Sequence, residues 1–152
     1  MYQKKKIIKQ NSFNEKINKI VYSLIMKFHH IGYLTNNIND SLKNFKFLNY
    51  KKDGIIVKDN LLKVKIQFLK NSNNLIELVK PDKNNYGLID ILNKKNYAYH
   101  FAYKVKNLEN SIKFLKKKFK IIINPIPAKA FKGKKVAFLK IKDGFIIELI
   151  QS

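Results

Sequence analysis

The segment His30-Ile31-Gly32-Tyr33 is matched 70 residues later by His100-Phe101-Ala102-Tyr103. One extra residue in a later turn makes the shift 71, which matches Ile76-Glu77-Leu78 with Ile147-Glu148-Leu149. Each half of the chain therefore has one His near its start and one Glu near its end. A repeat of this kind governs how the rest of a sequence is interpreted, because it predicts two copies of one folding unit.

Equivalent residues of two such copies come together when a pseudo-twofold axis relates the copies. This predicts that His30, Glu77, His100 and Glu148 converge on one divalent metal ion. Two imidazoles and two carboxylates suit zinc, nickel, cobalt or manganese, and the general order of affinities does not choose among them. His29 is the weaker candidate, because successive residues of a strand face opposite sides of a sheet.

The composition limits the class of protein. With 152 residues, the chain is long enough for one domain whose core needs no metal or disulfide to hold it. It has no Cys, which excludes disulfides and thiolate zinc sites. No apolar run approaches the roughly 20 residues of a membrane span, and no secretory signal is recognisable. We therefore expect a cytoplasmic protein without an integral membrane segment.

The formal net charge of +22 invites a nucleic-acid interpretation. All 32 basic residues are Lys, however, and they are spread along the whole chain. Base recognition in the major groove relies on the bidentate Arg fork, which this sequence lacks. We therefore expect no nucleic-acid partner. The charge is expected to form a solvated surface that helps an anionic small molecule arrive.

Apolar spacing predicts the same order of elements in both halves, namely a strand, a helix and three further strands. In the first half the expected ranges are 26–34, 37–47 for the helix, 55–57 after a turn at Gly54, 61–69 and 75–79. In the second half they are 97–105, 108–118 for the helix, 120–123, 134–140 and 145–150, with a Pro-containing loop after 123 and a connector helix over 86–94. Because most strands follow one another by hairpins, we expect an α+β fold with helices on one side of a curved mixed sheet.

The repeat divides the chain into one module at about 26–81 and a second at about 97–152. Residues 1–25 lie outside it as a basic N-terminal extension. Ile17, Ile20 and Leu24 fit one stripe of a short amphipathic helix, which would suit a membrane surface or a partner. A packed extension, a frayed extension and a misassigned gene start are the plainer alternatives.

Six motifs in order, together with the repeat, make residues 26–151 resemble the vicinal oxygen chelate superfamily. The motifs lie at 30–32, 64–69, 76–81, 99–103, 133–139 and 147–149. Within the superfamily, the chain is similar to bacterial glyoxalase I (lactoylglutathione lyase) and to methylmalonyl-CoA epimerase. The resemblance implies two βαβββ modules in tandem, which form a cup around one divalent ion held by the four ligands named above. We also expect a homodimer, because family members often dimerise and a half-open sheet has edges to cover.

The resemblance also implies a type of chemistry. Both related reactions remove a proton from a carbon next to a carbonyl and return it elsewhere or on the other face. Glu148 is then the first candidate for the general base and Glu77 the second, while the ion would stabilise the charge that develops on substrate oxygens. We expect a lactoylglutathione lyase-like enzyme that acts on a thiol conjugate of a 2-oxoaldehyde. The alternatives are an acyl-CoA epimerase, a non-catalytic binding or resistance protein, and an enzyme of another branch.

Three further residues are candidates for contact with substrate. Gln67 lies on the strand where some epimerases of the family carry an additional carboxylate, and its presence there with Lys65 counts against the epimerase mechanism. Lys134 and Lys135 follow Gly133 and would suit a carboxylate or phosphate of the substrate tail. The alternative for these two lysines is a solvated position at the start of a strand.

Overall fold

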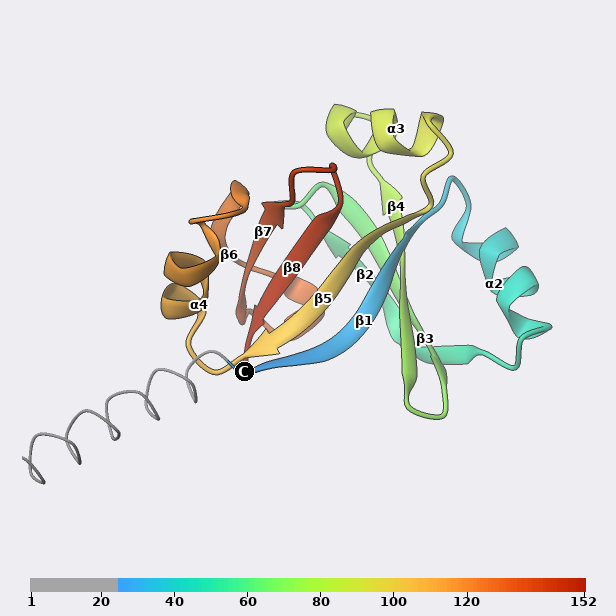
Figure 1. The fold of residues 1–152 in the computed structure, drawn as a ribbon. Helices are drawn as coiled ribbons and strands as arrows, with labels where there is room; N and C mark the ends of the chain where they lie inside the picture. The colour runs from blue at the N-terminus through green and yellow to red at the C-terminus, as the bar shows by residue number, and fades with distance from the viewer. Residues whose placement is uncertain (1–24) are drawn as a thin grey trace, which may run out of the picture.

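A computed structural model describes residues 25–152, whose eight strands form one curved sheet in the order β2-β3-β4-β1-β5-β8-β7-β6 (Figure 1). The first module contains β1 (Met26–Leu34), α2 (Ile38–Lys46), β2 (Lys51–Asp59), β3 (Val64–Asn71) and β4 (Asn74–Pro81). The second contains β5 (Ala98–Val105), α4 (Leu108–Leu115), β6 (Lys120–Pro127), the short 3-10 helix η1 (Lys129–Phe131), β7 (Lys135–Lys140) and β8 (Ile146–Gln151). Helix α3 (Tyr86–Asn93) connects them. The predicted α+β fold of two βαβββ modules is confirmed, whereas the stripe predicted within 1–24 lies outside the described residues.

The two modules meet at β1 and β5, an antiparallel pair in the middle of the sheet. Each of these strands runs parallel to the last strand of its own module, β4 or β8. Ile31 pairs with Phe101, and on either side of this pair His30 faces Ala102 and Gly32 faces His100. The repeat in the sequence therefore appears in the fold as a pseudo-twofold axis through the pair Ile31–Phe101.

Helices α2 and α4 cover the outer face of the sheet, one over each module (Figure 1). Ile38 of α2 packs with Leu69 and Leu78 of the strands beneath it, and Ile112 of α4 packs with Leu149. Both helices begin at equivalent asparagines, since the side chains of Asn37 and Asn107 accept hydrogen bonds from backbone N–H groups of the first turn. These caps satisfy donors that have no partner within the helix. Duplication thus extends to the way each helix starts.

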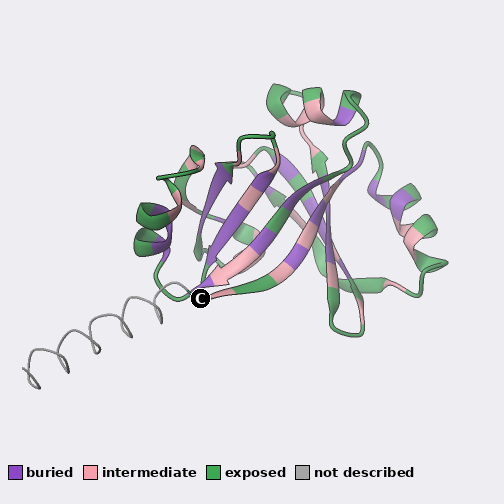
Figure 2. Cartoon of the chain, in the orientation of Figure 1, coloured by how far each residue is buried: buried purple, intermediate pink, exposed green. Residues whose placement is uncertain are grey.

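The inner face of the sheet holds a separate core. Buried and more exposed residues alternate along the strands, as the coloured bands in Figure 2 show. Helix α3 contributes Leu92 to this inner cluster, with Leu88 and Ile91 packed against it. Unlike α2 and α4, α3 therefore belongs to the inner side of the cup, which differs from the expectation that all helices lie on one side of the sheet. Among residues 25–152, no helix is both long enough and apolar enough to cross a bilayer.

Two segments expected to be irregular belong to strands. Gly54, predicted in a turn, lies within β2 at φ +75°, where the pairing with β3 changes register. The glycine adopts the left-handed conformation of a bulge, so the strand bends without ending. The predicted loop after Ile123 instead continues β6 through Pro125 and Pro127. Because β6 is an edge strand, one side of its backbone needs no hydrogen-bond partner and proline is tolerated.

The two ends of the sheet are joined through Asp59, a buried carboxylate at the end of β2. Its Oδ1 accepts hydrogen bonds from the N–H groups of Leu61 and Leu62 at 3.0 and 3.1 Å. Its Oδ2 accepts one from the N–H of Lys129 in η1 at 2.8 Å. The edge of the first module is thereby tied to the second, which keeps the cup closed around its inner core.

Candidate metal centre

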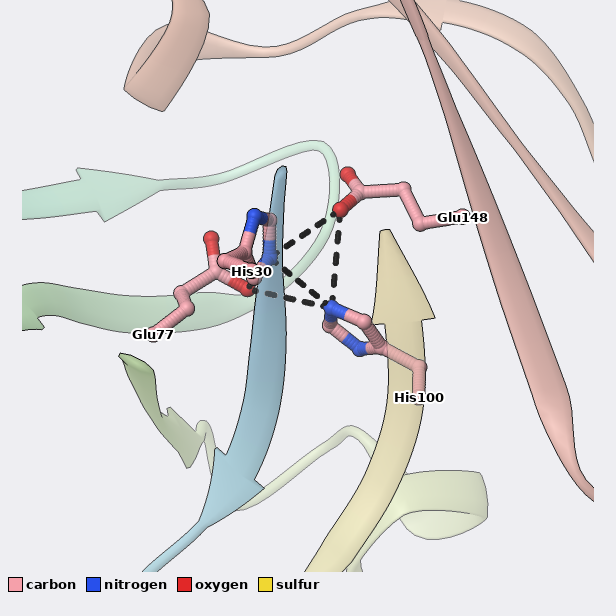
Figure 3. Close-up of side chains that lie close together, drawn as sticks. All are labelled: His30, Glu77, His100 and Glu148. Atoms are coloured by element: carbon pink, nitrogen blue, oxygen red, sulfur yellow. Dashed lines mark hydrogen bonds and ion pairs between the residues drawn. The ribbon is translucent and has the colours of Figure 1, made fainter. Parts of the chain in front are cut away.

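The four predicted ligands lie together on the inner face, each from a different strand (Figure 3). His30 Nε2 is 3.0 Å from His100 Nε2. The Oε2 atoms of Glu77 and Glu148 are both 3.3 Å from His30 Nε2, and 3.6 and 3.5 Å from His100 Nε2. One donor atom from each residue lies within 4.8 Å of the other three. All four side chains are buried.

Strand pairing explains why these residues converge. Across the sheet, Glu77 pairs with Gly32, which pairs with His100. The equivalent row is Glu148, Ala102 and His30. In each row the residue between the Glu and the His is small, so the two longer side chains can approach each other above it. At Gly32 this space is fully used, because a Cβ atom there would lie 2.1 Å from Cε1 of His100.

A β-bulge precedes each of the two histidines. The register between β1 and β5 shifts between Phe28 and His30, which leaves His29 as an extra residue in β1. It shifts again where Gly32 pairs with His100 and the next residue of β1 pairs with Ala98, which leaves Tyr99 as an extra residue in β5. A bulge turns a side chain away from the face that strict alternation gives it. His29 accordingly lies on the inner side, with its Nδ1 2.8 Å from Nδ1 of His30. The expectation that His29 faces the opposite side is therefore wrong.

Burial controls the charges in the site. Desolvation and then the charge of Glu77 raise the pKa of Glu148 to about 8. Burial also opposes ionisation of Glu77, but the rings of His30 and His100 outweigh it and hold the pKa of Glu77 below its ordinary value. Burial lowers the pKa of His100 to about 4. Without a cation, the site at pH 7 therefore holds one ionised carboxylate beside one protonated carboxyl group.

A divalent ion fits this arrangement of donors. Bonds to imidazole nitrogen and carboxylate oxygen are about 2.0–2.2 Å long, so two ligand atoms on one ion lie roughly 3–4 Å apart. The distances that involve a histidine Nε2, 3.0–3.6 Å, agree with this spacing, and the carboxylate oxygens of the two glutamates lie within 4.8 Å of each other. In addition, Glu148 Oε2 is buried without a hydrogen-bond partner among the described residues. A cation would give this oxygen a partner and allow both carboxylates to be ionised.

The candidate centre opens into a cavity of about 410 Å³. Glu77 and Glu148 contribute to its lining, and most of the remaining wall is apolar. The connector helix α3 closes one side with Leu88 and Ile91, and exposed Lys140 lies at another. A small molecule in this cavity would lie next to both carboxylates.

The three predicted substrate-binding residues lie elsewhere. Gln67 is buried, and its Nε2 donates to the backbone carbonyl oxygens of Asp53, Gly54 and Phe68 at 2.9–3.3 Å. This amide supports the bulged edge strand β2 and is not part of the cavity lining. Lys134 and Lys135 are exposed at the start of β7, also outside the lining.

Sequence reasoning did not identify Tyr99, which lines the cavity beside both carboxylates. Burial, followed by the charges of Glu77 and Glu148, raises the pKa of the Tyr99 hydroxyl well above its ordinary value. A signal for this residue was available, because position 99 is the repeat equivalent of His29. The bulges that turn both residues inward could not be foreseen from alternation alone.

Comparison with known proteins gives the family. Residues 29–138 match the family model described as Glyoxalase/Bleomycin resistance protein/Dioxygenase superfamily. No curated protein matches the sequence. Among solved structures, a hypothetical protein from Bacillus halodurans is 28% identical, with a TM-score of 0.72 over 84% of this chain and 94% of its own.

Two epimerases share the fold at lower identity. Methylmalonyl-CoA epimerase from Mycobacterium tuberculosis is 18% identical, with a TM-score of 0.72 over 85% of this chain and 89% of its own. A methylmalonyl-CoA epimerase variant from Streptomyces coelicolor, in complex with 2-nitronate-propionyl-CoA, is 16% identical, with a TM-score of 0.70 over 84% of this chain and 98% of its own. Because the family model spans more than half of the sequence, this protein belongs to the Glyoxalase/Bleomycin resistance protein/Dioxygenase superfamily, also known as the vicinal oxygen chelate superfamily.

Proposed function

We propose that this protein is a metal-dependent isomerase or lyase of the lactoylglutathione lyase type, acting on a thiol conjugate of a 2-oxoaldehyde. The observation that carries the proposal is the convergence of two buried imidazoles and two buried carboxylates at the wall of an apolar cavity. Members of the superfamily are often metal-dependent enzymes. A buried carboxylate pair without a cation is costly, so the arrangement is best explained by a function that requires it.

Each ligand has a defined task in this proposal. His30 and His100 would hold one divalent ion from the central strands, and Glu77 and Glu148 from the two flanking strands. The ion, when bound, would supply positive charge that stabilises the oxygens of the substrate as negative charge develops on them. The apolar cavity walls would orient the substrate and exclude water, which strengthens electrostatic interactions in the site.

Glu148 would take the proton from the carbon next to the carbonyl. Its Oε2 has no hydrogen-bond partner among the described residues, and burial raises the pKa of its carboxyl group to about 8, which makes Glu148 the more basic member of the pair. With the ion bound, Glu148 would be ionised and able to accept the proton. A general base is most effective when its pKa lies near the working pH. Glu77, on the opposite side of the pseudo-twofold axis, would be the second acid or base.

Acyl-CoA epimerisation is the second candidate. Solved epimerases of the same fold are known in complex with acyl-CoA compounds, including methylmalonyl-CoA itself. Exposed Lys140 at the cavity could also meet an anionic part of such a substrate. The same proton abstraction, followed by return to the other face of the carbon, would give this reaction without any change in the ligand set.

The assay that separates these functions uses metal-free protein reloaded with nickel, cobalt, zinc or manganese. Thioester formation from methylglyoxal with glutathione and other thiols is measured, and separately the exchange of the α-proton of methylmalonyl-CoA in heavy water. Activity with a thiol conjugate is the expected result. Exchange in the CoA ester alone would establish the epimerase. If metal-loaded protein shows neither activity, a binding or resistance protein, or an enzyme of another branch of the superfamily, would be favoured.

We further propose a homodimer in the cytoplasm. Within residues 25–152, the outer strands β2 and β6 each pair with a neighbour on one side only, and proteins usually cover such edges. Light scattering of purified protein tests the assembly, and a mass equal to one chain would contradict the dimer.

A further inference from the structure

The residues at the two β-bulges have different surroundings. His29 lies in an aromatic wall, with ring centroids 5.8 Å from Phe131 and 6.4 Å from Phe68. Tyr99 lines the open cavity together with Glu77 and Glu148. A molecule in the cavity can therefore touch Tyr99, whereas His29 is not part of the cavity lining.

The Tyr99 hydroxyl is a donor that finds no acceptor in the described part of the chain. The residue is only 5% exposed, and its ring lies 4.4 Å from that of His100 at an interplanar angle of 80°. Among residues 25–152, the hydroxyl makes no hydrogen bond, and the buried side-chain polar atoms without a partner are His100 Nδ1 and Glu148 Oε2 alone. The Tyr99 hydroxyl is therefore open to the cavity that the residue lines. Glu77 and Glu148 both act on it electrostatically. A ligand in the cavity between these groups can therefore accept a hydrogen bond from the Tyr99 hydroxyl.

We infer that Tyr99 is a catalytic hydrogen-bond donor, whose hydroxyl donates to the substrate oxygen that gains charge when Glu148 takes the proton. This inference rests on the proposed function. In that step the C–H bond breaks and its proton bonds to the Glu148 carboxylate. The electron pair forms a carbon–carbon double bond, while the π pair of the carbonyl moves onto its oxygen. The O–H bond of Tyr99 stays intact, because a phenol with an ordinary pKa of about 10 is protonated at neutral pH.

Such a donor favours the transition state over the ground state. The hydrogen bond strengthens as the oxygen becomes negative, and a substrate that fills the cavity displaces the water that would compete for it. Tyr99 is held in place by the bulge and by its packing on His100, so little reorganisation is needed when the charge forms. Its loss should therefore lower kcat more than it raises KM.

The test compares Tyr99→Phe with Tyr103→Phe, a variant of a half-buried tyrosine on the same strand with its ring against Phe28. Both variants and the wild type are loaded with cobalt. Acetohydroxamate, whose two adjacent oxygens imitate the charged reacting group, is titrated by calorimetry, and the cobalt absorption spectrum reports the ligand set. Where the wild type has activity in the thioester assay, kcat and KM are measured separately.

We expect Tyr99→Phe to bind cobalt with an unchanged spectrum and to bind acetohydroxamate roughly 10- to 100-fold more weakly, as is usual for a lost hydrogen bond to a charged group. A fall of similar size is expected in kcat, with Tyr103→Phe like the wild type. Equal acetohydroxamate affinity in wild type and Tyr99→Phe would overturn the role of Tyr99 and leave the proposed function standing. Failure of the cobalt-loaded wild type to bind acetohydroxamate would overturn both.

Discussion

The two modules place equivalent carboxylates on equivalent strands, yet the surroundings shift the pKa values of these two groups in opposite directions. Glu77 has a pKa held below its ordinary value by His30 and His100, whereas burial raises the pKa of Glu148 to about 8. Glu148 Oε2 also lacks a hydrogen-bond partner among the described residues. Duplication therefore fixes the positions of the candidate ligands, and the local surroundings decide which carboxylate is suited to accept a proton.

The largest effect should come from removing that proton acceptor. Glu148→Gln keeps the shape of the side chain but cannot take a proton, so kcat should fall roughly 10³-fold, within the usual range for a lost general base. Glu77→Gln should mainly weaken metal binding. Initial rates at saturating metal separate the two effects. The control is Glu109→Gln, the same change at an exposed position on α4. An unchanged kcat in Glu148→Gln would assign the base elsewhere.

A second test concerns the small residues between ligands, which are Gly32 in one row and Ala102 in the other. In Gly32→Ala the new Cβ would collide with the buried ring of His100, so the ring or the strand must move. Overpacking of this kind costs about 3 kcal/mol, and metal affinity should fall with it. Urea unfolding and metal titration measure both quantities. Gly87→Ala is the control, because a Cβ there meets no atom within 4 Å. Equal stability of the two variants would show that Gly32 does not define the site.

A third test weakens the connection between the modules. Asp59→Asn replaces the Oδ2 acceptor of the Lys129 N–H with a donor, which leaves a buried pair of donors facing each other. The expected loss is about 2 kcal/mol of unfolding free energy. Thermal unfolding measures it against Asp40→Asn, which alters an exposed ion pair with Lys43. If the two variants melt together, Asp59 is not what closes the cup.

The smallest effect is the response of metal-free protein to pH. The pKa of Glu148 is about 8 when folded and near 4.5 when unfolded, so between these values the folded state binds more protons and stability falls as pH rises. The lowered pKa of His100 acts oppositely, but only below about pH 6.5. From pH 6.5 to 8 the metal-free protein should lose about 1 to 2 kcal/mol of unfolding free energy. Metal-loaded protein should gain stability over the same range, because its ligands bind metal when deprotonated. Urea unfolding at a series of pH values measures both forms. If their unfolding free energies change with pH in the same direction, the predicted role of Glu148 would be contradicted.

The repeat made much of the fold and the candidate centre predictable. The pairs His30–His100 and Glu77–Glu148 could be identified because equal positions in two copies meet across a pseudo-twofold axis. The places of the helices followed from apolar spacing, although the helix predicted over 108–118 ends at Leu115. These features depend on local sequence or on symmetry, and both can be read without coordinates.

The remainder depends on irregular backbone and on long-range contacts. Alternation along a strand gave the wrong face for His29 and no reason to single out Tyr99, because a bulge adds a residue without a clear mark in the sequence. Pro125 and Pro127 suggested a loop, since nothing local shows that a strand lies at an edge. Gln67 looked like a site residue, but its amide is used by the backbone of β2, a contact that only the folded chain reveals.

The most direct test of the central claim is the metal content of purified protein after equilibrium dialysis against nickel or zinc. We predict close to one ion per chain in the wild type and in Glu109→Gln, and little or none in His100→Ala, although that variant should remain folded by circular dichroism. Wild-type protein that takes up no divalent ion, or His100→Ala protein that retains a full equivalent, would contradict the account.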